Sequence, residues 1–304
     1  ITLAYTLSPG GGVHSEFSVH KESDESYYLV SAGVYRRIDH DWLKKHLAEF
    51  TGGDASVRYD DLSTQWGVLV LAGPKSKEVL QRVSADDFSN DSFKWLTGRD
   101  VCLGMAPVKA MRVNFIGELG WELHHPIEFQ NHLFDTLMEA GEDLGIKPFG
   151  IRAMSMMRLE KSYRMPGAEL SIEYSALESG LDRFLDLNKK EALNMKGLLD
   201  WKEKGFHNQL VTLRVHDVDD ADPVGNNPVF KDGEMVGRVT SAGYGFRVGY
   251  PIALAMVRPD LAKEGNELEI DILGKRHKVS IIPESPYDAS NIRLRDVELQ
   301  EAAE

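Results

Sequence analysis

Two periodicities of hydrophobic and polar positions alternate along the first two thirds of the chain. Short apolar or alternating runs predict strands, and apolar residues repeated every three or four positions predict amphipathic helices. The strands are expected at residues 16–19, 27–32, 66–72, 108–116 and 121–123. The helices are expected at residues 41–50, 74–83, 127–140, 150–161 and 194–204. Because the run at 66–72 is apolar throughout, we expect that strand to be buried.

Beyond residue 205 the pattern is almost entirely that of strands. Six short runs are separated by turns such as Asp232-Gly233, and they lie at residues 210–215, 227–231, 235–241, 252–257, 268–273 and 277–282. This spacing is typical of a small antiparallel barrel or sandwich. The composition shifts at the stretch 189–206, which is rich in Lys, Glu and Asn. We therefore expect two domains, 1–204 and 205–304.

Charge and hydropathy limit the classes of partner. Lys and Arg number 35 and Asp and Glu number 48, which gives a formal charge of −13. Nucleic acids and anionic membranes both select basic surfaces, and no apolar run reaches the roughly 18 residues of a membrane-spanning helix. We therefore expect no nucleic acid and no membrane as partner. The expected location is the cytoplasm, or the mitochondrial matrix of a eukaryote. Because the chain opens on a strand-like pattern at Ile1, we expect it to be part of a longer polypeptide.

Most familiar catalytic motifs are absent from the sequence. It has no phosphate-binding loop, no strand-linked dinucleotide fingerprint and no nucleophile elbow. The single cysteine, Cys102, lies between apolar neighbours and is expected in the core. His124 and His125 are adjacent, so on a strand they would point to opposite faces and could not share a metal. We expect both histidines to be solvated and no metal site.

A few polar residues at strand, turn and helix positions remain as candidates for chemistry: Glu16, Glu118, Glu122, Arg152 and Arg158. Each also has an ordinary structural interpretation. Arg158 and Glu160 could be surface charges, and Glu118 could be a turn residue. Spacing alone leaves both interpretations open.

Several segments in combination are more specific than any single residue. They lie at residues 5–7 with 11–19, 115–123, 152–161, 237–244 and 252–257. In this order, and over nearly the whole chain, they resemble the glycine cleavage T-protein (aminomethyltransferase) family. The forms Gly-Glu-Leu-Gly-Trp-Glu-Leu at 117–123, Arg-Leu-Glu-Lys at 158–161 and Leu-Glu-Ser-Gly-Leu at 177–181 resemble, more narrowly, the C-terminal folate-binding half of dimethylglycine and sarcosine dehydrogenases.

This resemblance implies an α+β fold in which mixed α/β domains surround a central hole and a small antiparallel β-barrel follows. It implies tetrahydrofolate as cofactor and the transfer of an aminomethyl or methyl group from a small-molecule donor. The chain would be the folate module of a demethylating enzyme. FAD would belong only to an upstream flavin domain or a flavoprotein subunit, which would then be its partner. A stand-alone aminomethyltransferase, an O- or S-methyl demethylase, and a non-catalytic folate-binding module remain open alternatives.

The resemblance also assigns two carboxylates. Glu16 takes the place of a family Asp near folate N5, where it would act as acid, base or electrostatic stabiliser. Its side chain is longer by one methylene, about 1.5 Å. Glu122 matches a Glu that accepts hydrogen bonds from the pterin N–H groups, a role that suits an acceptor-only carboxylate.

The remaining assignments concern the walls of the folate site. Phe115 stands where many relatives have Tyr, so stacking on the ligand would survive but a phenolic hydrogen bond would not. The guanidinium of Arg152 could bind a carboxylate of folate. Further folate-contacting positions implied by the resemblance are Tyr5, Val30, Ser31 and Tyr244. Core packing is the alternative role for Tyr5.

Overall fold

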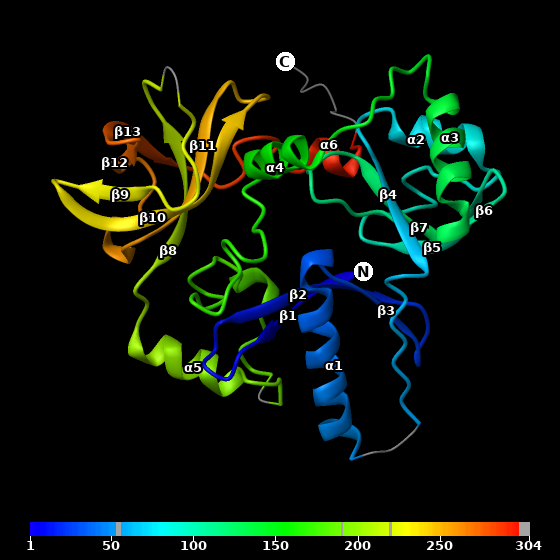
Figure 1. The fold of residues 1–304 in the computed structure, drawn as a ribbon, viewed down its shortest axis with the longest axis horizontal. Coiled ribbons are helices and arrows are strands. Elements are labelled where there is room, and N and C mark those ends of the chain that lie inside the picture. The colour runs from blue at the N-terminus through cyan, green and yellow to red at the C-terminus, as the bar shows by residue number, and fades with distance from the viewer. Residues whose placement is uncertain (53–55, 190, 219–220, 298–304) are drawn as a thin grey trace, which may run out of the picture.

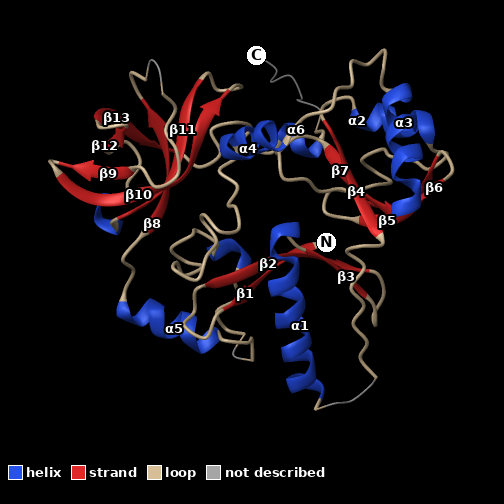
Figure 2. Cartoon of the chain, viewed as in Figure 1, coloured by secondary structure: helices blue, strands red, loops and turns tan. Residues whose placement is uncertain are grey.

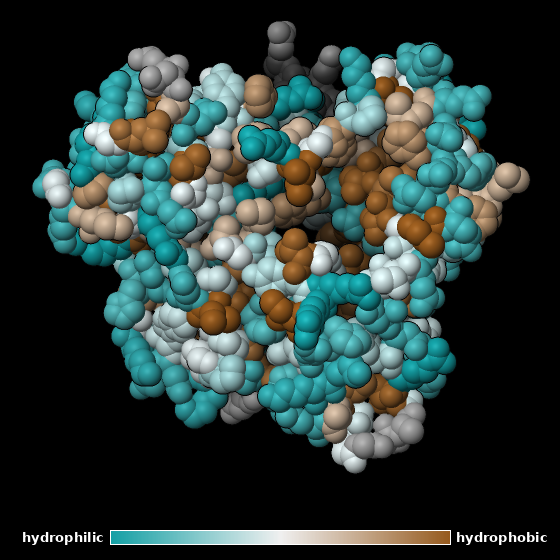
Figure 3. Space-filling model, in the orientation of Figure 1, coloured by the Kyte–Doolittle hydropathy of each residue, from teal (hydrophilic) through white to brown (hydrophobic). Residues whose placement is uncertain are grey.

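Three structural units surround a central hollow, as the ribbon and space-filling views show (Figures 1 and 3). The structure is a computed structural model that describes residues 1–52, 56–189, 191–218 and 221–297. The units are a three-stranded sheet, a four-stranded sheet covered by helices, and a closed barrel. None of the helices within the described ranges has the length and apolar character needed to cross a membrane.

The first unit is an antiparallel sheet in the order β1-β2-β3, followed by a long helix. The strands are β1 (Thr2–Leu7), β2 (Val13–Lys21) and β3 (Tyr27–Val30). A short turn of 3₁₀-helix, η1 (Gly33–Tyr35), leads into α1 (Arg36–Thr51). The register places Tyr5 of β1 directly opposite Glu16 of β2. Directly opposed residues point to the same side of a sheet, so these two side chains share one face.

The glycine run before β2 serves close packing. Gly11 has φ +90°, and a Cβ atom on it would lie 2.5 Å from the backbone of Gly197. Gly197 belongs to α5 (Met195–Lys204), and a Cβ atom there would meet the Pro9 carbonyl oxygen at 2.4 Å. Only glycine fits at such a backbone-to-backbone approach. The run therefore joins the first sheet to α5.

The second unit is a sheet in the order β4-β7-β6-β5, with helices on one face (Figure 2). Its elements are β4 (Trp66–Ala72), α2 (Ser76–Val83), β5 (Gly98–Leu103), β6 (Ala106–Met111), β7 (Gly120–Pro126), η2 (Ile127–Phe129) and α3 (Gln130–Ala140). The core between sheet and helices contains Leu71, Leu80, Trp121, Leu123 and Leu133. The other face of the sheet is turned toward the first unit and the hollow.

The third unit confirms the barrel expected from the alternating C-terminal pattern. Its strands are β8 (Gln209–Val215), β9 (Pro228–Lys231), β10 (Glu234–Gly245), β11 (Tyr250–Val257), β12 (Glu267–Ile272) and β13 (Lys275–Ile282), with η4 (Pro259–Leu261) between β11 and β12. They close in the order β10-β11-β8-β13-β12-β9. The α+β fold class is therefore as expected, and residue 205 stays our proposed domain boundary.

Several local predictions were wrong. Strand β5 was not predicted, the strand expected at 108–116 ends at Met111, and the helix expected from residue 74 begins at Ser76. Cys102 is exposed, because it faces outward on the edge strand β5 while Val101 and Leu103 face the core. Both His124 and His125 are buried and hydrogen-bonded, although they do point to opposite faces of β7.

Helix α4 (Ile151–Glu160) connects the units through the charged residues at its C-terminal end. These residues are buried, so their partners lie in other parts of the chain. Arg158 lies 3.3 Å from the Glu169 carboxylate and is buried, so the interpretation of Arg158 as a surface charge is wrong. Glu160 instead accepts hydrogen bonds from the backbone N–H groups of Arg247 and Val248 at 2.5 and 3.1 Å. Those residues form the turn between β10 and β11, which is thereby fixed to α4.

Lys161, the next residue, holds the C-terminal segment. Its ammonium donates to the carbonyl oxygens of Tyr287 and Asp288 and to Asn291 Oδ1, at 3.2, 2.7 and 2.8 Å. After the barrel, this segment returns past α4 and ends in the short helix α6 (Ile292–Arg295) beside the second unit (Figure 1). Glu118, which is buried rather than an exposed turn residue, accepts the Tyr287 hydroxyl at 2.6 Å.

We expect Glu169→Ala to lower the free energy of unfolding by about 3–5 kcal/mol, because it leaves the Arg158 guanidinium buried without a counter-charge. Urea denaturation measures this change. Asp200→Asn is the matched control, since Asp200 pairs with Lys196 at 2.5 Å on an exposed helix face. The control should change the free energy by less than about 0.5 kcal/mol. Equal effects of the two variants would contradict a structural role for the buried pair.

Candidate functional site

The face of the second sheet that looks toward the hollow carries exposed apolar side chains beside a carboxylate. Val68 and Val70 of β4 are 47% and 39% exposed, which corrects the prediction that this strand is buried. In the register of β4 and β7, Val70 lies opposite Glu122 and Val68 lies opposite His124. The Glu122 carboxylate is therefore bordered by apolar surface on this face. Such a surface suits a flat ligand with apolar faces and polar edges.

The first sheet presents the second candidate carboxylate. Glu16, His20 and Tyr28 share one face, because Glu16 and His20 are four residues apart on β2 and His20 pairs with Tyr28 of β3. Tyr28 Oη lies 3.2 Å from His124 Nδ1, on the strand face that also carries Glu122. The faces that carry Glu16 and Glu122 thus meet at this contact. We take the opening between these two faces as the candidate site.

The surroundings of Glu16 are unusual for a carboxylate. Burial raises its pKa, and the Tyr5 hydroxyl and the positive charge of Arg164 oppose this rise only in part. Burial also raises the pKa of Tyr5, and the charge of Glu16 adds to that effect. The phenol therefore stays protonated beside the carboxyl group. Tyr5 also packs against the buried cluster that contains Leu7 and Leu177, so the alternative role in core packing holds beside its contact with Glu16.

The segment at residues 177–181 explains how Arg164 is held near Glu16. Arg164 is buried and donates to the carbonyl oxygens of Ser162, Ser179 and Gly180 at 3.1, 2.9 and 3.2 Å. Gly180 has φ +66°, and a Cβ atom there would lie 2.7 Å from the guanidinium. The glycine of this segment is therefore required by the arginine that packs on it.

Phe115 lies in the turn between β6 and β7 and stacks on Tyr163, with ring centroids 6.1 Å apart and an angle of 28° between the planes. Sequence reasoning missed Tyr163, which follows the Arg-Leu-Glu-Lys segment without a motif of its own. Burial raises the pKa of Tyr163 to about 12, so its hydroxyl stays neutral. Together, the two stacked rings form an aromatic surface.

The other predicted residues lie farther apart. Val30 ends β3 opposite Ser18, and Ser31 follows it. Arg152 is exposed in the first turn of α4 and makes no hydrogen bond within the described part of the chain. Tyr244 lies at the end of β10, packed edge-on against Phe246 at 5.1 Å. Neither Arg152 nor Tyr244 contacts Glu16 or Glu122.

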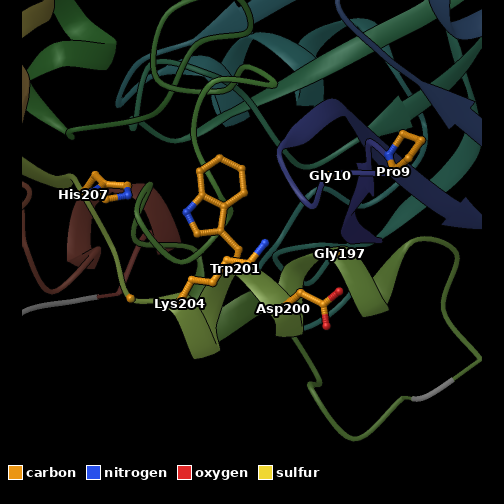
Figure 4. Close-up of a pocket in the computed structure, with 8 residues that line it drawn as sticks. Pro9, Gly10, Gly197, Asp200, Trp201, Lys204 and His207 are labelled. Atoms are coloured by element: carbon orange, nitrogen blue, oxygen red, sulfur yellow. The ribbon is translucent and has the colours of Figure 1, made fainter.

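Two cavities lie elsewhere. One of about 270 Å³ lies between the β1–β2 turn and α5, where Trp201, Lys204 and His207 stand on one side and Pro9 and Gly10 on the other (Figure 4). A second, of about 600 Å³, lies on the barrel beside Tyr244, Tyr250 and Arg214. Of the predicted site residues, Tyr244 lines the second of these two cavities. The opening between the sheets therefore remains the place where candidate carboxylates and exposed apolar side chains meet.

Comparison with known families decides the identity of the fold. The family model of the GCVT N-terminal domain matches residues 1–189, and that of the glycine cleavage T-protein C-terminal barrel domain matches residues 208–288. The chain belongs to the glycine cleavage T-protein family. The aminomethyltransferase T of Bartonella henselae has the same fold, with a TM-score of 0.82 and 20% identity over 95% of this chain and 76% of that one.

Curated relatives of two kinds match this chain. Mouse mitochondrial dimethylglycine dehydrogenase is 35% identical over 283 residues, which are 93% of this chain and 32% of that protein. The aminomethyltransferase of Thermoanaerobacter sp. (strain X514) is 28% identical over 287 residues, 94% of this chain and 76% of that protein. The T-protein-like chain thus spans about a third of the length of the dimethylglycine dehydrogenases it matches.

We expect Glu16→Gln to raise the melting temperature at pH 8, because folding then buries a neutral amide instead of a charged carboxylate. The raised pKa of Glu16 means that the folded protein binds more protons than the unfolded chain above the ordinary pKa of glutamic acid, about 4.3. Stability of the wild type therefore falls as pH rises through this window. The gain should shrink as pH falls toward about 4. Calorimetry measures it, and the exposed Glu128→Gln is a control that should show no such pH dependence.

Proposed function

We propose that this T-protein-like chain transfers a one-carbon unit from a small aminomethyl or methylene-iminium donor to tetrahydrofolate. One observation carries the proposal: Glu16, whose pKa is raised by burial, and Glu122, bordered by partly exposed valines, lie on two sheet faces that meet at the contact between Tyr28 and His124. Membership of the T-protein family and the two kinds of relative support it.

The opening fits the pterin ring of folate. A pterin has two flat apolar faces and an edge of N–H donors. Val68 and Val70 offer partly exposed apolar surface, and the adjoining Glu122 offers an acceptor-only group. The Phe115 and Tyr163 rings, the backbone at Val30 and Ser31, and Tyr5 would form further walls. We keep Tyr244 as a proposed contact from the barrel, and Arg152 as the proposed cation for the anionic end of folate.

When bound, tetrahydrofolate supplies the amines N5 and N10, which take the methylene carbon of an iminium donor, R₂N⁺=CH₂, to give 5,10-methylenetetrahydrofolate, R₂NH and one proton. Glu16 accepts the proton at the N5 position, because its raised pKa brings the carboxylate closer to the basicity that proton transfer at neutral pH requires. The neutral Tyr5 hydroxyl holds the carboxylate in place. Glu122 and the apolar surface orient the ligand and exclude water.

The parent protein would supply the donor. An iminium of this kind arises by two-electron oxidation of an N-methyl group, for which FAD is a suitable acceptor. We propose that the chain works beside a flavin domain or flavoprotein subunit, as its 35% identity to one third of dimethylglycine dehydrogenase supports. The donor would then be a small N-methyl amine such as dimethylglycine or sarcosine. In a eukaryote, the proposed location is the mitochondrial matrix.

We expect Glu16→Gln to lower the rate of 5,10-methylenetetrahydrofolate formation by about 10²- to 10⁴-fold, since it removes the proton acceptor. The dissociation constant for tetrahydrofolate, measured by calorimetry, should stay within about threefold because the residues that orient the ligand remain. Exposed Glu128→Gln is the matched control and should change neither quantity. A wild-type protein that binds tetrahydrofolate but never forms the product would instead be a non-catalytic folate-binding module.

The proposed flavin partner leads to a separate prediction for the complete enzyme, in which this chain works beside the flavin domain or subunit. With dimethylglycine as substrate, Glu16→Gln should leave flavin reduction unchanged and release formaldehyde, because an iminium that is not captured is hydrolysed by water. Stopped-flow absorbance measures flavin reduction, and a colorimetric assay measures formaldehyde. Loss of flavin reduction in this variant would show that Glu16 acts outside the folate step.

A further inference from the structure

Three side chains form a hydrogen-bonded chain from the first sheet to the second. Tyr28 Oη of β3 lies 3.2 Å from His124 Nδ1, and His124 Nε2 lies 3.2 Å from Glu122 Oε2. The rings of Tyr28 and His124 meet edge to face, at 5.4 Å and 88°. His124 is 1% exposed, so water cannot replace either partner. The chain ends at the carboxylate that we assign to ligand binding.

The directions of these hydrogen bonds follow from what each group can donate. An ionised carboxylate can only accept, so His124 must carry a proton on Nε2. Burial, together with the charges of Glu22 and Glu122, raises the pKa of Tyr28 to about 12, so the phenol keeps its proton. A neutral imidazole protonated at Nε2 has a free Nδ1, which accepts the Tyr28 hydroxyl proton. The Glu122 carboxylate therefore selects this tautomer, and the Tyr28 hydroxyl donates to the ring nitrogen left free.

Further charged and titratable groups surround these three side chains. Lys109 of β6 lies opposite His124 in the register, and its ammonium is 5.7 Å from the centre of the Tyr28 ring. That ammonium is held by Glu22 and Asp100, both at 2.8 Å. His20 pairs with Tyr28 on the other side, and burial lowers its pKa. Lys109, with its two carboxylate partners, and His20 thus flank these three side chains.

We propose that Tyr28 and His124 are positioning residues that hold Glu122 with one oxygen occupied and the other available to a ligand N–H donor at the opening. This inference rests on the proposed function and deepens it, because it names what sets selectivity for a ligand with an amino edge. A free glutamate side chain has three rotatable bonds and would lose that freedom on binding. With Oε2 held by His124, the carboxylate is ordered before the ligand arrives.

The test compares two probes, tetrahydrofolate and its 2-desamino-2-methyl analogue. The analogue lacks the amino group from which Glu122 would accept a hydrogen bond. Calorimetry gives the dissociation constants of the wild type, Tyr28→Phe, His124→Phe and Glu122→Gln. We expect Tyr28→Phe and His124→Phe to weaken tetrahydrofolate binding by about tenfold, the worth of one oriented hydrogen bond, and to change analogue binding by less than about twofold. His124→Gln, which restores an N–H donor near Nε2, should recover most of the loss.

The outcomes separate this inference from the proposed function. Equal weakening of both probes by Tyr28→Phe would mean that the residue only packs the sheets together, and would overturn the inference. The wild type should prefer tetrahydrofolate to the analogue. If Glu122→Gln loses this preference while Tyr28→Phe and His124→Phe keep it, the inference is overturned and the proposed function stands. A wild-type protein that fails to bind tetrahydrofolate would overturn the proposed function itself. Tyr28→Phe removes one hydroxyl group, so the test does not depend on folding of the His124 variants.

Discussion

The arrangement of the three units depends on charges buried at one end of α4. Arg158, Glu160 and Lys161 are each 2% exposed or less, so each must find partners inside the protein. An unpaired charge in that position would cost several kcal/mol. Each finds its partners in a different segment: the Glu169 carboxylate, the β10–β11 turn and the C-terminal segment. The units therefore cannot shift relative to α4 without leaving a buried charge unsatisfied.

This rigid frame allows the middle of the molecule to stay open. One face of the second sheet packs Trp121 and Leu123 against the helices, while its other face leaves Val68 and Val70 partly exposed. A carboxylate with a raised pKa, Glu16, lies on the facing sheet at some loss of stability. Exposed apolar side chains and a buried carboxylate are both unfavourable in a protein that only needs to fold. Their presence at one opening is what a binding site requires, and the stability comes from the buried network elsewhere.

The sequence predicted what depends on local periodicity and left out what depends on contacts between units. The six barrel strands follow from alternation and turns, and the likeness to the T-protein family placed the candidate carboxylates on two strands. Strand β5 was missed because Arg99 and Asp100 interrupt its short apolar pattern. His124 was expected in solvent because a strand pattern shows which face a residue takes, not that Tyr28 from a distant strand covers that face. Val68 and Val70 were expected to be buried for the converse reason: an apolar run does not reveal that one face borders a hollow.

The formal charge of −13 also constrains how an anion such as folate could be held. A net negative protein repels an anionic ligand at long range, so short-range cations must compensate for it. Arg158 and Lys161 cannot serve, since internal carboxylates and carbonyl oxygens already occupy them. Arg152 is exposed, lies in the first turn of α4 and makes no hydrogen bond within the described ranges. The positive end of the helix dipole adds to its charge. The cations at the C-terminal end of α4 thus stabilise the fold, while Arg152 in its first turn remains available to a ligand.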